Sequence, residues 1–154
     1  MRALHWTDRL LGHVDRSLKT LTGTLPVANS FEYDRRDYAL TSDEQSKSRQ
    51  LMRVNHCGEV CAQGLYHGQM LSARNDSTKA HLEHAAEDEQ KHLVWCQERL
   101  RELNGQTSYL NPFWYGASFM VGAATGLMGD KVSLGFIAAT EEEVCKHLDR
   151  HLAE

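Results

Sequence analysis

The sequence is poor in residues that interrupt helices and in the cysteine pairs that cross-link small secreted folds. Proline occurs only at Pro26 and Pro112, and most of the remaining chain is periodic in Ala, Leu, Glu and Gln, which favours helices. The four cysteines form no CxxC pair, which favours reduced thiols in a cytosolic setting. At 154 residues with 41% apolar content the chain can bury one core, so we expect a single all-α domain.

An excess of basic charge is also lacking. The formal net charge is −4 and the sequence pI is about 6.1, so the chain offers no basic field for nucleic acid. The N-terminus has no apolar core of signal-peptide type, and Asp8 and Asp15 argue against an acid-poor transit peptide. One helical face there carries the apolar side chains Trp6, Leu10, Val14, Leu18 and Leu21. We expect this amphipathic helix to pack on its own domain or a neighbouring subunit, with membrane contact as the alternative.

Turn and capping signals divide the rest of the chain. We expect an amphipathic helix at 1–24, a connecting segment at 25–40 and a helical domain at 41–154. Within that domain, the predicted helices cover about 42–71, 78–104, 111–128 and 132–154. Thr41 and Glu44 have capping-box spacing at the first of these helices, and Gly105 suits the left-handed position after the second. The short break near residue 75 makes those two helices antiparallel neighbours.

Three glutamates lie on apolar stripes of these helices, where an isolated charge is costly. Glu89 and His92 are i and i+3, so they project from one face, while Glu59 comes from a second helix and Glu141 from a third. Carboxylate and imidazole ligands without thiolate suit iron or manganese, and carboxylates able to bridge suit a dinuclear centre. The four residues therefore predict half of a carboxylate-bridged di-iron site.

Other assignments compete for some of these residues. A single ExxH step such as Glu89 to His92 occurs by chance in many helices and usually faces solvent with an ion-pair partner. Cys57 and Cys61 are i and i+4, but the sequence supplies no second cysteine pair to complete a tetrahedral zinc site, which favours packing for all four thiols. His56 is either a partner of a ligand or a packed histidine. The remaining histidines at helical spacing are interpreted mostly as surface groups: His81, His84, His147 and His151.

Residues 110–129 contain no charged side chain and include aromatic residues and a GxxxG pair, Gly122 and Gly126. By length this segment is a transmembrane candidate. Pro112 at its start and its many small residues favour instead a helix that packs on the bundle. We expect its aromatic and Met side chains to lie at a membrane surface or at the entrance for a lipid substrate.

From about residue 53 to its end, the chain resembles the demethoxyubiquinone hydroxylases of ubiquinone biosynthesis, which are ferritin-like di-iron monooxygenases. The motifs that carry the resemblance are Arg53-Val-Asn-His-Cys-Gly-Glu59, Tyr66-His-Gly-Gln69, Glu89-Gln-Lys-His92, Pro112-Phe-Trp114 and Thr140-Glu-Glu-Glu-Val-Cys-Lys-His147. The resemblance implies a ferritin-like bundle in which Glu59, Glu89 and His92 hold one iron and Glu141 begins the shell of a second. Asn55 departs from the family, many members of which have Asp there.

The resemblance also implies the activity, which is hydroxylation of the ring of a prenylated demethoxyubiquinol with O2. NADH is a possible electron donor, although no GxGxxG follows a strand. A peripheral position on the cytoplasmic face of a bacterial inner membrane, and other ubiquinone-biosynthesis proteins as partners, belong to the same expectation. The family's further ExxH helix does not occur before Glu154, so we expect this chain to bind metal weakly and to lack turnover.

Two other classes of protein share part of this pattern. A ferritin-like iron-binding or peroxide-scavenging protein needs the carboxylates but not the apolar segment at 110–129. A non-enzymatic membrane-associated helical module needs that segment but not Glu59, Glu89 and Glu141. Only the hydroxylase interpretation uses both features.

Overall fold

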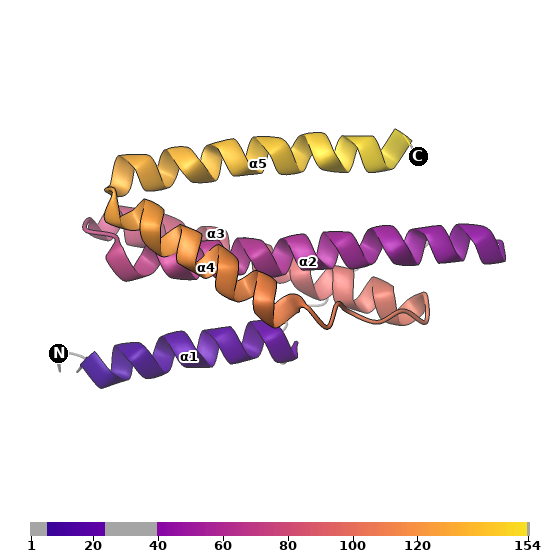
Figure 1. The fold of residues 1–154 in the computed structure, drawn as a ribbon, viewed down its shortest axis with the longest axis horizontal. Helices are drawn as coiled ribbons and strands as arrows, with labels where there is room; N and C mark the ends of the chain where they lie inside the picture. Colours follow the sequence, from indigo (N-terminus) through magenta and orange to yellow (C-terminus); the bar gives the residue numbers. More distant parts are fainter. Residues whose placement is uncertain (1–5, 24–39, 154) are drawn as a thin grey trace.

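The computed structural model describes residues 6–23 and 40–153, and every regular element in these ranges is a helix. The helices are α1 (Trp6–Thr22), α2 (Ser42–Ser72), α3 (Asp76–Glu102), α4 (Asn111–Leu127) and α5 (Asp130–Ala153). In Figure 1, α2 runs through the middle of the molecule, α4 crosses it obliquely, and α1 and α5 lie on opposite sides. The predicted all-α fold is confirmed. The connecting segment expected at 25–40 lies outside the described residues except for Leu40.

Local signals explain where the helices begin and end. At the start of α2 the Thr41 side chain accepts a hydrogen bond from the Glu44 backbone N–H, and the Glu44 carboxylate accepts one from the Thr41 N–H, which completes the predicted capping box. The prediction of a left-handed residue at Gly105 was wrong, because Asn104 has that conformation, with φ 54°. The short polar side chain of Asn tolerates the left-handed region, so the turn forms one residue earlier.

The closest helix contact is between α2 and α4. Gly64 and Gly68 of α2 face the backbone of α4, while Gly122 and Gly126 of α4 face the backbone of α2. A Cβ atom at Gly68 would clash with the backbone carbonyl oxygen of Phe119. The GxxxG spacing on α4 therefore serves close packing inside the bundle. No helix among the described residues is long and apolar enough to cross a membrane.

Buried polar side chains link α2 to its neighbours. The Gln63 side-chain amide donates to the backbone carbonyl of Ala86 on α3 at 2.5 Å. The fully buried Gln69 donates to the backbone carbonyl of Ser133 on α5 at 3.0 Å. These bonds fix the register of α2 against both helices, and with it the carboxylates that α2 and α3 carry.

The last helix has a different environment from the others. α5 packs chiefly on α4, and of its described side chains only Ser133 and Ile137 are buried. Ile137 reaches the core cluster that also contains Tyr66, Met70 and Leu82. The described side chains in the C-terminal half of α5 are therefore exposed or only partly covered.

Candidate metal centre

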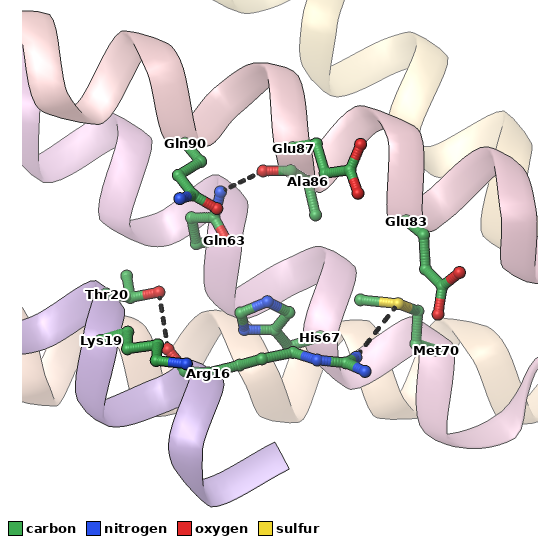
Figure 2. Close-up of a pocket in the computed structure, with 10 residues that line it drawn as sticks. All are labelled: Arg16, Lys19, Thr20, Gln63, His67, Met70, Glu83, Ala86, Glu87 and Gln90. Atoms are coloured by element: carbon green, nitrogen blue, oxygen red, sulfur yellow. Dashed lines mark hydrogen bonds between the residues drawn. The ribbon is translucent and has the colours of Figure 1, made fainter. Parts of the chain in front are cut away.

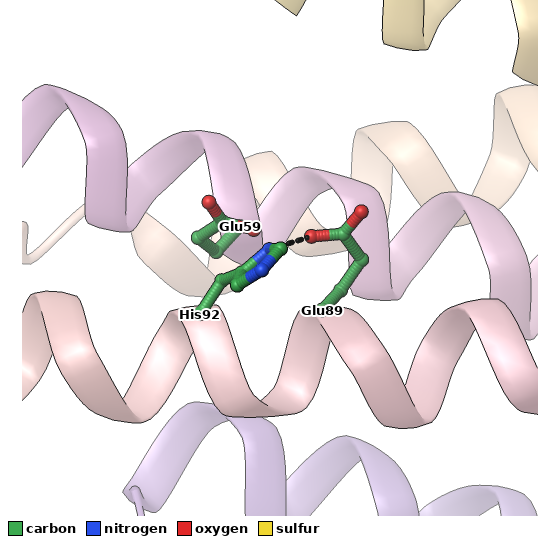
Figure 3. Close-up of side chains that lie close together, drawn as sticks. All are labelled: Glu59, Glu89 and His92. Atoms are coloured by element: carbon green, nitrogen blue, oxygen red, sulfur yellow. Dashed lines mark hydrogen bonds and ion pairs between the residues drawn. The ribbon is translucent and has the colours of Figure 1, made fainter. Parts of the chain in front are cut away.

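Glu59 of α2 meets Glu89 and His92 of α3 where these two antiparallel helices pass each other. Each residue offers one ligand atom, and these atoms all lie within 4.8 Å of one another. Figure 3 shows Glu59 directed from α2 toward α3, and His92 and Glu89 directed back from successive turns of α3. No other group of three such residues forms among the residues that the structure describes. The structure thus brings together three of the four predicted ligands.

The two carboxyl groups of this cluster shift each other's pKa. Burial, together with a hydrogen bond to Glu89 and its charge, raises the pKa of Glu59 to about 9. Burial and the charge of Asp88 raise the pKa of Glu89, but the hydrogen bonds from His92 and Glu59 and the charge of His92 outweigh them, so this pKa lies below its ordinary value. His92 Nδ1 lies 2.9 Å from Glu89 Oε2, and this bond raises the pKa of His92. Without a metal, therefore, the site holds a proton on Glu59 in order to relieve the repulsion.

The fourth predicted ligand, Glu141, lies apart from the other three. It is exposed on α5 and is not a member of the group whose ligand atoms lie within 4.8 Å. The Tyr66 hydroxyl of α2 donates to Glu141 Oε1 at 3.3 Å, and the charges of Glu89 and Glu59 act on the same phenol. The sequence analysis found Tyr66 in a motif but predicted no role for it. Tyr66 lies seven residues after Glu59, which is two helical turns along the same face, and this spacing could have predicted that it lies near the cluster.

The other histidines and the cysteines lie outside the cluster. His81 and His84 are exposed, in agreement with the sequence prediction. His56 is a packed histidine: it is 4% exposed, its Nδ1 accepts from the Asn111 side-chain amide at 3.3 Å, and burial lowers its pKa to about 4.

All four cysteines are free, and no thiol joins a group of three metal ligands among the described residues. Burial raises the pKa of Cys57 to about 11, with Cys61 contributing, and raises that of Cys96 to about 12, with Glu59 contributing. These thiols stay protonated at neutral pH, as expected for packing.

A separate cavity of about 380 Å³ lies between α1, α2 and α3. In Figure 2 the ring of His67 points into it, with Arg16 and Lys19 of α1 on one side and Glu83 and Glu87 of α3 on the other. None of its lining residues belongs to the Glu59, Glu89 and His92 cluster. Because charged groups of both signs line this cavity, it does not suit an apolar tail.

Comparison with known proteins gives a consistent answer. The family model described as "Ubiquinone biosynthesis protein COQ7" matches residues 46–154. The chain is 50% identical over 149 residues to the 3-demethoxyubiquinol 3-hydroxylase of Pseudomonas fluorescens (strain SBW25), with 96% of this chain and 69% of the relative covered. It is 48% identical over 158 residues to the enzyme of the same name from Nitrosococcus oceani, with 98% and 72% covered. No solved structure matches the chain.

The fold and the cluster define an all-α protein with a carboxylate and histidine group between two antiparallel helices that could hold a metal ion. The matches to the family model and to the relatives show to which family within this class the chain belongs. The chain belongs to the COQ7 family of ubiquinone biosynthesis proteins, and with it the chain has a hydroxylase role in that biosynthesis.

Proposed function

We propose that this chain serves the hydroxylation of the ring of a prenylated demethoxyubiquinol with O2, with one iron held by Glu59, Glu89 and His92 and with Glu141 beginning the shell of a second. One observation carries the proposal. The three ligand atoms that converge within 4.8 Å lie on α2 and α3, in a chain about half identical to proteins named 3-demethoxyubiquinol 3-hydroxylase. The substrate follows from the names of these relatives, and the iron from the chemistry of the donor groups.

The residues present fit such a metal. Two carboxylates and an imidazole, with no thiolate, are the donor set that iron and manganese prefer. Burial and the neighbouring Glu89 raise the pKa of Glu59, so two negative charges here are unfavourable without compensation. A divalent cation supplies that compensation and displaces the proton. The Glu89 to His92 step on one helix, facing a glutamate of the next helix, is also the arrangement typical of di-iron carboxylate bundles.

Bound iron would supply the activation of O2, and the protein's own groups would orient the metal and shield it. Glu89 holds the His92 ring by a 2.9 Å hydrogen bond in the metal-free protein, so the ring is already directed toward the cluster. Val60 and Leu93, each next in sequence to a residue of the cluster, are almost completely buried in the core with Tyr115, so this core closes one side of the cluster, while His92 is exposed on the other. One oxygen atom enters the ring and the other leaves as water, with two electrons from a donor for which NADH is our candidate.

The exposed apolar side chains of α4 suit the lipid part of the reaction. Phe113 is 64% exposed, Met120 68% and Leu127 68%. These side chains are exposed even though the glycines of α4 pack closely against α2. An apolar surface of this kind is expected to contact a membrane or a prenyl tail. We therefore propose a peripheral protein at the cytoplasmic face of a bacterial inner membrane, where other proteins of ubiquinone biosynthesis are possible partners.

The test is incorporation of isotopic oxygen. The iron-loaded chain is given a short-tailed demethoxyubiquinol, a reductant and ¹⁸O2, and the product is analysed by mass spectrometry. One ¹⁸O atom in the ring for the wild type and none for Glu89→Gln, with Glu98→Gln, an exposed carboxylate on the same helix, turning over as the wild type does, would establish the activity and overturn the expectation that this chain lacks turnover. Consumption of peroxide without labelled product would instead support an iron-binding peroxide scavenger.

A further inference from the structure

Tyr66 is a buried phenol placed among all the carboxylates of the candidate site. Its side chain is 3% exposed, and its hydroxyl donates to Glu141 Oε1 at 3.3 Å. Burial and the nearby charges of Glu89, Glu141 and Glu59 all raise the pKa of Tyr66. A phenol has an ordinary pKa of about 10 and a carboxylate can only accept, so at neutral pH the hydroxyl is the donor in this hydrogen bond.

The same side chain is linked to two successive turns of α5, through a shared core cluster and through its hydroxyl. Its ring belongs to the core cluster that contains Ile137, and its hydroxyl binds Glu141. Ile137 and Glu141 are i and i+4, so they lie on one face of that helix. α5 packs chiefly on α4, and beyond Ile137 its described side chains are not buried. Tyr66 is thus the contact that holds the Glu141 turn of α5 against α2.

We propose that Tyr66 is a positioning residue, which donates a hydrogen bond to Glu141 and thereby presents this carboxylate to the dinuclear centre whose first metal Glu59, Glu89 and His92 would hold. The inference rests on the proposed metal centre and gives Tyr66 a specific part in it. Without the hydroxyl, Glu141 is an ordinary exposed carboxylate at a helix surface, free to adopt rotamers directed toward water. With the hydroxyl, one of its oxygens is fixed on the side of α5 that faces α2 and α3.

Tyr66→Phe removes the hydroxyl and keeps the ring in the core. Groups that orient a metal ligand typically contribute 10-fold to 100-fold in metal affinity. We therefore expect Tyr66→Phe to weaken metal binding by about that factor. Glu141→Ala removes the carboxylate that Tyr66 acts through, so it should weaken binding at least as much. The double variant should bind no more weakly than Glu141→Ala, because the two residues form one unit.

Tyr115→Phe is the matched control. Tyr115 is also buried, at 6% exposed, and its hydroxyl also has hydrogen bonds, to Ser17 and His67 at 2.8 Å each. None of its contacts is with a carboxylate of the site. The same chemical change at Tyr115 therefore tests whether the loss of any buried hydroxyl weakens metal binding.

The experiment is an anaerobic titration of the 154-residue chain with Co²⁺ alone, in which the visible spectrum of bound cobalt reports affinity and coordination. Thermal unfolding of each variant separates loss of the fold from loss of the site. The inference is supported if Tyr66→Phe and Glu141→Ala weaken binding with the same spectral change, the double variant adds nothing, and Tyr115→Phe binds as the wild type does. Because Glu141 is exposed, its variant keeps the test valid even where Tyr66→Phe unfolds.

Two results would overturn the inference in distinguishable ways. If the wild type binds cobalt and Tyr66→Phe binds it equally well, or if the effects of the two substitutions multiply, Tyr66 does not act through Glu141 and the metal centre stands. If the wild type itself binds no cobalt, the proposed metal centre fails and the role of Tyr66 fails with it.

Discussion

Replacing Glu59 with Gln should stabilise the metal-free protein while it weakens metal binding. The pKa of Glu59 rises from 4.5 to about 9 on folding, because of burial and the neighbouring Glu89. At pH 7 the unfolded chain has an ionised Glu59 and the folded, metal-free protein a protonated one. Each pH unit between the unfolded pKa of 4.5 and pH 7 lowers the free energy of unfolding by about 1.4 kcal/mol, which amounts to about 3 kcal/mol at pH 7. Gln has nearly the same shape and no charge, so Glu59→Gln recovers up to about 3 kcal/mol.

The sign of the pH dependence follows from the same numbers. The wild type has its full stability below pH 4.5, where Glu59 is protonated in both states, and loses stability as the pH rises toward about 9. The advantage of Glu59→Gln should therefore be absent near pH 4 and grow with pH. Urea unfolding in the presence of a chelator measures it. Glu98→Gln, an exposed carboxylate of α3, should change stability by less than about 0.5 kcal/mol at each pH.

Added metal should reverse the order of stability. Ferrous ion binds only the folded protein, so it raises the unfolding midpoint of the wild type but leaves that of Glu59→Gln almost unchanged. The reasoning is refuted if metal-free Glu59→Gln is less stable than the wild type at pH 7, or if its advantage does not depend on pH. Either result would make Glu59 an ordinary structural carboxylate.

Two further substitutions test the packing and the buried histidine. Gly68→Ala places a Cβ atom against the backbone of Phe119 and should lower the stability measured by urea unfolding by about 1–3 kcal/mol. In the control Gly58→Ala the new Cβ atom meets no neighbour, so the change should be neutral or stabilising by up to about 1 kcal/mol. Equal effects of the two substitutions would contradict the close packing of α2 on α4. Burial lowers the pKa of His56 from 6.5 to about 4, so the unfolded chain takes up a proton first and stability falls as the pH drops through this range. Relative to His56→Gln, the wild type should lose about 2 kcal/mol between pH 7 and pH 5, and parallel pH profiles would exclude this account.

The helices were predictable because their signals are local. The capping box of Thr41 and Glu44 fixes the start of α2, and the spacing of apolar residues gives its face. Glu59, Glu89 and His92 could be predicted together for the same reason. A short connection makes α2 and α3 antiparallel, and the helical period then decides which side chains meet.

The surroundings of Glu141 could not be predicted, since they depend on how α5 is tilted. The apolar positions around this residue suggest a buried stripe, yet Leu148 is 41% exposed and Cys145 is exposed as well. Periodicity gives the face of a helix but not the depth to which that face is covered. The hydrogen bond from Tyr66 depends on this same geometry between helices, which is why the motif that contains Tyr66 revealed no role for it.

The measurement that tests the central claim most directly is the iron content per chain after anaerobic loading, with a Mössbauer spectrum, for the wild type and for Glu89→Gln. The account predicts bound iron with nitrogen and oxygen ligands in the wild type and loss of that iron in the variant, because Glu89 is hydrogen-bonded to both Glu59 and His92 in the cluster. Iron retained equally by both proteins, or bound by neither, would contradict the assignment of Glu59, Glu89 and His92 as a metal centre.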